Sequence, residues 1–356
     1  MITAPFSQQA PSLPNKPYEK SIEFTGTASE YFRIWVVNIF LSIVTLGIYS
    51  AWATVRTRKY FYQHTRLLGQ GFDFHGDPKR ILKSRLIAAA VYLCFSFIPK
   101  MWPLSWKWSL IAFYLALPAV IVQALRFRMS NTSYRSIRFG FAGKFRQACA
   151  VYFLYPIAAA LSLGLALPAL TCRAYRYWVS GVRFGTQAAE TDLSTKQFCL
   201  IYLKALGISL LSAAIYGTSI YLFYEQRAGL LTLMLSIIPV VIVLFFWLLI
   251  RPYLKTNFQN LLYNNTHFGG LRFKSSLRFR GVFWLSLTNF LMIALSFGLL
   301  VPYTKVRSAR YMAERLEVFG PDSQDMDKFV AGISSNPTAT GDGLVDLFGI
   351  DIPAIG

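Results

Sequence analysis

The sequence predicts an all-α polytopic membrane protein with about seven hydrophobic helices. Of its 356 residues, 54% are hydrophobic and only 15% are charged, whereas soluble domains carry roughly 25% charged residues. Several apolar windows reach about 20 residues, the length at which an α-helix crosses the hydrocarbon core of a bilayer. Three similar segments also return along the chain, and internal repeats of this kind indicate a repeated architecture. A soluble helical protein would have to bury all of these runs, so we expect an integral membrane protein.

The repeated segment starts where an apolar run ends, at Thr45 and Gly47, and continues into a basic and aromatic stretch. Two further copies are centred on Gly164 and Gly298. When the glycines are aligned, the copies place an Arg, a second basic residue and a Tyr in shared columns: Arg56, Lys59 and Tyr60; Arg173, Arg176 and Tyr177; Arg307, Arg310 and Tyr311. We predict that the glycines are helix breaks or points of close packing.

Two further patterns accompany this repeat. Asn38 and Asn289 occupy one column, in which the second copy has Tyr155. An Asn or His followed by Thr, with a Phe eight residues after the first position, occurs at His64-Thr65, Asn131-Thr132 and Asn265-Thr266. The nearby aromatic residues and glycines predict short β-like elements at the membrane edge, and simple turns are the alternative.

The apolar runs occur in the order single run, hairpin, single run, hairpin, single run, at about 31–53, 86–99 with 108–125, 148–171, 206–224 with 230–250, and 282–303. We therefore expect a flexible tail at 1–21, a membrane domain at 22–320 and a flexible tail at 321–356. The repeat segments of the membrane domain are 22–147, 148–281 and 282–320.

Two topologies compete for this order of runs. If all seven runs cross, Lys and Arg are nearly balanced between the two sides of the membrane, and such a chain can follow the inverted-repeat plan of transporters. If the three glycine-containing runs enter and return, only Lys100, Lys107 and Arg227 lie on the far side. The positive-inside rule favours this one-face topology, whereas the length of each run favours crossing. Both topologies place the C-terminus in the cytoplasm.

The chain resembles the YjgN-like family of bacterial inner-membrane proteins, which lack an assigned function. The resemblance covers most of residues 22–320 and rests on the following positions: Phe24, Gly26, Tyr31, Phe32, Asn38, the string 45–49 with Trp52, the segment 56–60, Thr65, Gly69, Phe72 and Asn265-Thr266. It implies a multi-pass protein of the bacterial cytoplasmic membrane. It carries no catalytic residues over to this chain.

The sequence contains little catalytic chemistry. No apolar run has Asp or Glu in its middle, which argues against proton-coupled transport. The four Cys and three His lack metal-ligand spacing, and no hydrolase, zinc-protease or phosphate-loop pattern occurs, so we expect neither an enzyme nor a cofactor or metal. The net charge of +20 comes from 36 Lys and Arg against 16 Asp and Glu. These basic residues flank apolar runs, so we expect anionic lipids rather than nucleic acid as their partner.

Two functions remain open. The first is permeation or transport of an anionic small molecule, or handling of a lipid headgroup, with the Asn, Arg, Lys and Tyr columns as the binding residues. The second is a non-catalytic scaffold that binds anionic lipid and a protein partner. A deep polar cavity lined by both Asn38 and Asn289 would favour transport, and a filled core between the repeats would favour the scaffold. A homo-oligomer is compatible with either function.

Overall fold

The computed structural model describes residues 18–320 except for 102–104, 186, 226–229 and 269–270. The predicted tail at 321–356 lies outside the described residues. Most of the predicted tail at 1–21 also lies outside them, although its last four residues form a strand.

An antiparallel sheet of eleven strands organises the chain, so the predicted all-α class is wrong. The strands are β1 (Tyr18–Ser21), β2 (Glu23–Phe24), β3 (Thr65–Leu67), β4 (Gln70–Phe74), β5 (Thr132–Tyr134), β6 (Ile137–Phe141), β7 (Val182–Phe184), β8 (Gln187–Thr191), β9 (Thr266–Phe268), β10 (Leu271–Ser275) and β11 (Leu316–Gly320). Each has two to five residues. Strands this short leave almost no alternating pattern, whereas the helical runs between them dominate the hydropathy of the sequence.

The two ends of the sheet meet in one extended segment. Its strand order runs from β1 through β11 and β10 down to β3 and β2, and only Ile22 separates β1 from β2. The Ile22 amide donates to the Leu316 carbonyl at 3.0 Å, on the β11 side of the segment. Aromatic side chains from across the sheet, including Phe24, Tyr134 and Phe268, share one buried core. The first and last described segments, β1 and β11, are therefore fixed to each other.

Helical hairpins connect the strands, and the succession of strand, helical hairpin and strand occurs five times. The helices are α1 (Ala28–Val44) and α2 (Ser50–His64); α3 (Pro78–Met101) and α4 (Ser105–Ser130); α5 (Phe145–Cys149), the π-helix η1 (Ala150–Leu154), α6 (Tyr155–Leu161) and α7 (Leu167–Gly181); α8 (Thr195–Glu225) and α9 (Leu230–Asn264); α10 (Phe279–Leu295) and α11 (Val301–Ala313). We call each succession a unit. Our division into three repeat segments, whose boundaries at 147/148 and 281/282 fall within α5 and α10, remains a prediction.

One backbone hydrogen bond is common to all five units. The first residue after the entering strand donates to the carbonyl of a residue at or just beyond the end of the second helix. The pairs are Thr25 to His64 at 2.9 Å, His75 to Asn131 at 2.8 Å, Ala142 to Gly181 at 2.7 Å, Asp192 to Asn265 at 3.0 Å, and Ser276 to Arg315 at 2.9 Å. Both ends of every helical hairpin are thereby held at the sheet.

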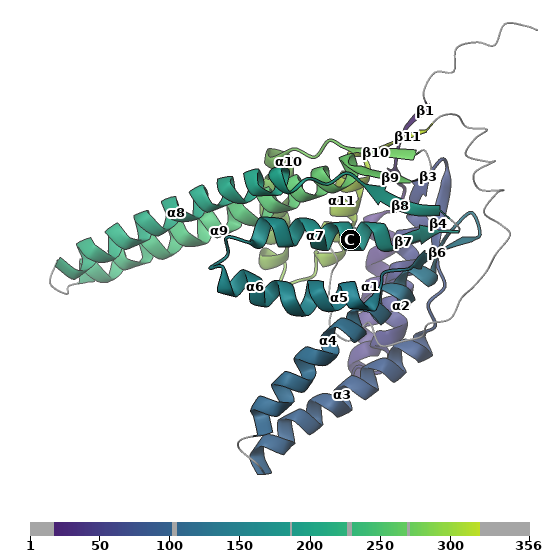
Figure 1. Cartoon of the computed structure of the whole chain (residues 1–356), viewed down its shortest axis with the longest axis horizontal. Helices are drawn as coiled ribbons and strands as arrows, with labels where there is room; N and C mark the ends of the chain where they lie inside the picture. Colours follow the sequence, from purple (N-terminus) through teal and green to yellow (C-terminus); the bar gives the residue numbers. More distant parts are fainter. Residues whose placement is uncertain (1–17, 102–104, 186, 226–229, 269–270, 321–356) are drawn as a thin grey trace, which may run out of the picture.

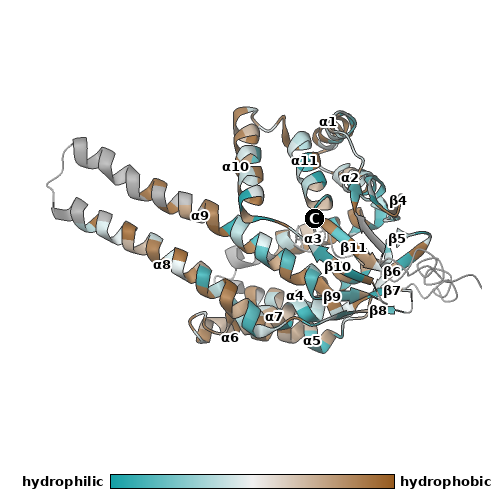
Figure 2. Ribbon diagram, turned by 90° about the horizontal axis from the view of Figure 1, so that it is seen from above, coloured by the Kyte–Doolittle hydropathy of each residue, from teal (hydrophilic) through white to brown (hydrophobic). Residues whose placement is uncertain are grey.

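The helical hairpins fall into two length classes. Helices α3, α4, α8 and α9 have 24, 26, 31 and 35 residues, and Figure 1 shows both of these hairpins projecting away from the strands. The helices of the other three hairpins have at most 17 residues. Within the described residues, two stretches are long and apolar enough to cross a membrane, Leu110–Ser130 and Thr195–Thr218, rather than the seven that we predicted. Figure 2 shows the apolar character of the described part of α8.

Candidate functional site

The three predicted glycines lie at the tips of the three short hairpins. Gly47, Gly164 and Gly298 have φ values of +89°, +87° and +90°, in the left-handed region that favours glycine. The backbone N–H of each donates to the carbonyl five residues earlier, at 2.7, 2.8 and 2.9 Å, which ends the first helix in a Schellman-type turn. A Cβ at Gly47 or Gly298 would meet no atom within 4 Å. Backbone conformation rather than close packing therefore requires these glycines.

The same tips expose apolar side chains almost completely. Leu46, Leu163 and Phe297, each just before a tip glycine, are 95%, 92% and 98% exposed. Ile48, Leu165 and Leu299, each just after one, are also exposed. Apolar surface of this kind at three equivalent points is typical of contact with lipid or with another protein.

The Asn/His-Thr motifs end the second helices of three units. The side chains of both motif positions bond to carbonyls four residues earlier: His64 to Tyr60, Thr65 to Phe61, Asn131 to Phe127, Thr132 to Arg128, Asn265 to Leu261 and Thr266 to Leu262, at 2.6–2.9 Å. These bonds add a side-chain donor to carbonyls in the last turn of each helix, where backbone donors run out. The Thr then begins the next strand, so the motif marks the change from helix to strand.

The second basic column of the repeat ties neighbouring units together. Arg176 of α7 donates through Nε to the carbonyl of Leu193 at 3.0 Å, and Arg310 of α11 donates through Nη2 to the carbonyl of Gly26 at 3.0 Å. Both acceptors are the second residue after the strand that enters the next unit. We call this contact the clasp. The Arg310 clasp joins the last unit to the first.

Two clasps involve residues that the sequence did not single out. Arg126 of α4 reaches the carbonyl of Gly143 at 3.4 Å, and Asn260 of α9 reaches that of Leu277 at 2.8 Å. In these two and in the Arg176 clasp, donor and acceptor are 17 residues apart. The constant spacing of 17 residues is a signal that the sequence contains. The sequence analysis missed it because the acceptor is a backbone carbonyl, which any residue type supplies.

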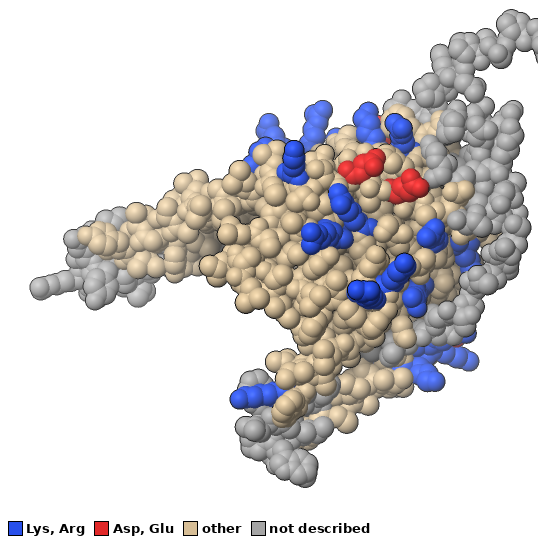
Figure 3. Space-filling view, viewed as in Figure 1, with Lys and Arg blue, Asp and Glu red and all other residues tan. Residues whose placement is uncertain are grey.

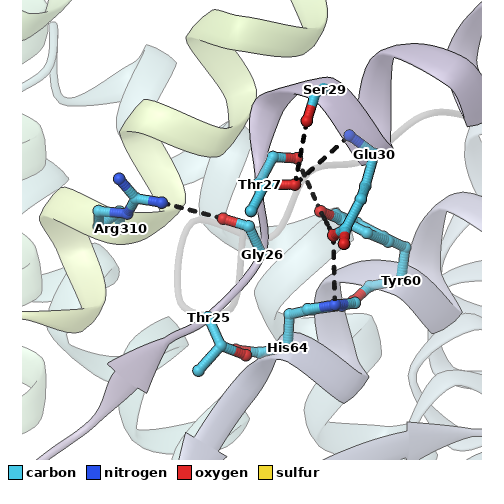
Figure 4. Close-up of polar contacts among 8 residues, drawn as sticks. All are labelled: Thr25, Gly26, Thr27, Ser29, Glu30, Tyr60, His64 and Arg310. Carbon is cyan, nitrogen blue, oxygen red and sulfur yellow. Dashed lines mark hydrogen bonds and ion pairs between the residues drawn. The ribbon is translucent and has the colours of Figure 1, made fainter.

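The junction between the last and first units contains further polar contacts (Figure 4). The Tyr60 hydroxyl donates to the Thr27 carbonyl at 2.8 Å. Glu30 Oε2 lies 3.3 Å from the Tyr60 hydroxyl oxygen and 3.8 Å from His64 Nε2. The hydrogen bond from the Thr27 side chain lowers the pKa of Glu30, and burial raises the pKa of Tyr60. Because Tyr60 and also Tyr177 are buried in the core, these two candidates face the protein interior.

The first basic column has a different arrangement in different units. Arg56, Arg173 and also Lys59 are exposed, and none of them has a bonding partner among the described residues. Arg307 is bound instead: its Nη1 donates to Thr288 Oγ1 at 2.7 Å and to Asn289 Oδ1 at 3.2 Å.

The two predicted asparagines do not line one shared cavity. Asn38 lines a groove of about 580 Å³ along α1 and α2, whereas a separate hollow of about 340 Å³ lies beside α10 and α11 and is lined by Arg307, Arg310 and Tyr311. Asn38 is 5% exposed. Its Nδ2 makes a long hydrogen bond of 3.5 Å to the Ala53 carbonyl, and its Oδ1 has no partner among the described residues. No group of three or more metal-ligating side chains occurs in the part of the chain that the structure describes.

Projecting apolar hairpins and a basic body fit a membrane protein, and comparison with known proteins gives the family. The model of a family described as "Bacterial protein of unknown function (DUF898)" matches residues 19–347, so the chain belongs to that family. It is similar to Inner membrane protein YjgN of Salmonella typhimurium, 24% identical over 371 residues that cover 90% of this chain and 94% of that protein.

The protein of the same name from Escherichia coli K12 is 29% identical over 150 residues, which cover 40% of this chain and 36% of that protein. No solved structure matches the chain. These relatives confirm the YjgN-like resemblance and an inner-membrane location.

Proposed function

We propose that the protein is a non-catalytic membrane scaffold that binds anionic phospholipid from the cytoplasmic face of the inner membrane. In this proposal the sheet and both chain ends lie on the cytoplasmic side. The two long hairpins cross the bilayer and return, and the three short hairpins enter only the near leaflet.

The connection of hairpins to strands supports this placement. Both ends of each hairpin join neighbouring strands of one sheet, so each unit leaves the sheet and returns to the same side. At 1.5 Å per residue, the 31 residues of α8 extend about 46 Å, more than the roughly 30 Å of a hydrocarbon core. The 17 residues of α1 extend only about 25 Å from the sheet.

Apolar tips combined with exposed cations carry the assignment to anionic lipid. Arg56, Lys59 and Arg173 lie on the short hairpins that carry the exposed tips, and these cations have no bonding partner among the described residues. Near an anionic membrane each such cation contributes about 1 kcal/mol of attraction. On the face shown in Figure 3, Lys and Arg gather mostly over the body, and the described surface of the α8/α9 projection carries none.

Permeation is the weaker candidate. A polar cavity shared by Asn38 and Asn289 would favour permeation. Asn38 instead lines the groove along α1 and α2, and the Asn289 side chain is hydrogen-bonded to Ser308. Buried aromatic side chains such as Tyr134, Phe184 and Phe268 fill the core against the sheet. A filled core favours the scaffold.

Thiol labelling tests the placement. In a variant without Cys94, Cys149, Cys172 and Cys199, single cysteines replace Trp108 and Tyr221 on the long hairpins, Leu163 at a short tip, and Arg272 on the sheet. A membrane-impermeant thiol reagent added to intact cells should label positions 108 and 221 only. Labelling at 163 or 272 from outside, or none at 108 and 221, would refute the one-face placement.

A further inference from the structure

The groove along α1 and α2 combines apolar side chains with polar and cationic ones. Trp35, Ile39 and Ile43 line it from α1, and Thr54, Thr57 and Arg58 from α2. Lys305 of α11 lies beside it. None of the described residues that line it is acidic. Such a surface fits a molecule that is apolar at one end and anionic at the other.

The groove also has a polar requirement that the protein does not meet. In the last unit the equivalent asparagine is satisfied on both sides: Asn289 Oδ1 accepts from Arg307 at 3.2 Å, and its Nδ2 donates to Ser308 Oγ at 2.9 Å. In the first unit, position 37 is Val where the last unit has Thr288, which helps to hold Arg307. Arg56, the counterpart of Arg307, is exposed. Asn38 Oδ1 therefore lacks the donor that its counterpart has.

Three cations lie at or beside the groove, and they differ in how they are held within the protein. Arg58 stacks over the Phe74 ring at 5.4 Å, and Arg85 of α3 donates to Ser50 Oγ at 2.6 Å and to Thr54 Oγ1 at 2.9 Å. Lys305 is exposed and has no bonding partner among the described residues. Its ammonium group can therefore donate to an anion without breaking a contact within the protein.

We propose that this groove binds the headgroup of a phospholipid that carries a phosphate and a free hydroxyl, as phosphatidylglycerol does. Lys305 binds the phosphate, with Arg58 and Arg85 adding positive potential. The headgroup hydroxyl supplies the donor for Asn38 Oδ1, and Ile39 and Ile43 contact the acyl chains. The inference rests on the proposed function, since it requires that the groove face the bilayer.

A titration of the purified full-length protein in detergent tests the site. The thermal unfolding temperature is measured against phosphatidylglycerol, phosphatidic acid, phosphatidylcholine and the soluble headgroup analogue glycerol phosphate. Lys305→Gln should weaken phosphatidylglycerol binding at least about tenfold, the size of one lost charge-assisted hydrogen bond. Asn38→Leu should weaken phosphatidylglycerol binding but not binding of phosphatidic acid, which has no headgroup hydroxyl. Lys144→Gln, which replaces an exposed lysine outside the groove, is the matched control and should leave both affinities unchanged.

The outcomes separate this site from general membrane attraction. If phosphatidylglycerol stabilises the wild type more than phosphatidylcholine does, and Lys305→Gln and Asn38→Leu bind it unchanged, the groove site is wrong while the scaffold proposal stands. If the wild type does not distinguish the two lipids, both proposals fail. If glycerol phosphate alone saturates the effect, the ligand is a free phosphate and the lipid assignment is wrong.

Discussion

Replacing Arg310 by Met tests whether the clasp holds the first and last units together. Met retains an apolar stem but removes the donor to the Gly26 carbonyl at 3.0 Å. A hydrogen bond from a charged group contributes about 1.5–3 kcal/mol when it is buried. Because Arg310 is exposed, solvent screening reduces this, and we expect a loss of about 1 kcal/mol. The unfolding temperature of the purified protein should fall by about 2–4 °C.

A local measurement separates the clasp from a general loss of stability. Arg310 joins α11, which leads into β11, to Gly26, which follows β1 and β2. Amide hydrogen exchange should therefore accelerate in Tyr18–Ser21 and Leu316–Gly320 more than in the pairing of β5 with β6. Arg56→Met is the control, because Arg56 has no bonding partner among the described residues. If Arg310→Met and Arg56→Met have equal unfolding temperatures, or if exchange rises uniformly across the sheet, the clasp does not hold this junction.

Three further predictions follow from the turns, the clasps and the titrating groups. Gly47→Ala should lower stability by about 1–2 kcal/mol because φ is +89° there, whereas Gly207→Ala in the middle of α8 should be neutral or stabilising; equal effects in thermal unfolding would contradict the strain argument. Lys59 occupies the clasp column of the first unit without making the contact, so Lys59→Arg should raise the unfolding temperature and Lys59→Gln should not. Since the folded pKa of Glu30 is lowered from 4.5, its contribution to stability is present above that pH and is lost as pH falls through the lower value. The difference in acid stability between wild type and Glu30→Gln should therefore shrink below pH 4.5, and a difference that grows there would refute the sign.

Local conformational requirements were readable from the sequence. A glycine at the end of an apolar run, as at Gly298, marks a position with positive φ, and the structure has that conformation in all three copies. The pair Asn265-Thr266 signalled a change in local structure, since Asn and Thr side chains compete for backbone groups at helix ends. These signals lie within a few residues of the feature that they determine.

Long-range pairing was not readable. The strand β1 pairs with β11 almost 300 residues later, for example Tyr18 opposite Gly320, and nothing in either short segment specifies the other. Arg176 and Arg310 were assigned to a lipid-facing column because they are basic and flank apolar runs, whereas the structure bonds both to backbone carbonyls of the next unit. Tyr60 was a candidate binding residue, but its ring packs on Tyr31 in the core, where it gains burial of apolar surface.

The turn at Gly47 and the continuity of the sheet both require that the two ends of a helical hairpin lie on the same side of the membrane. The apolar stretch at 31–53 is long enough to cross a bilayer once, yet the turn divides it into most of α1 and the start of α2 and returns the chain to the strands. Had any unit crossed once, its entering and leaving strands would lie on opposite sides of the membrane, where they could not belong to one hydrogen-bonded sheet. Each unit must therefore cross an even number of times or not at all. The pairing of β1 with β11, together with the Arg310 clasp, requires the same of the whole chain between residues 18 and 320.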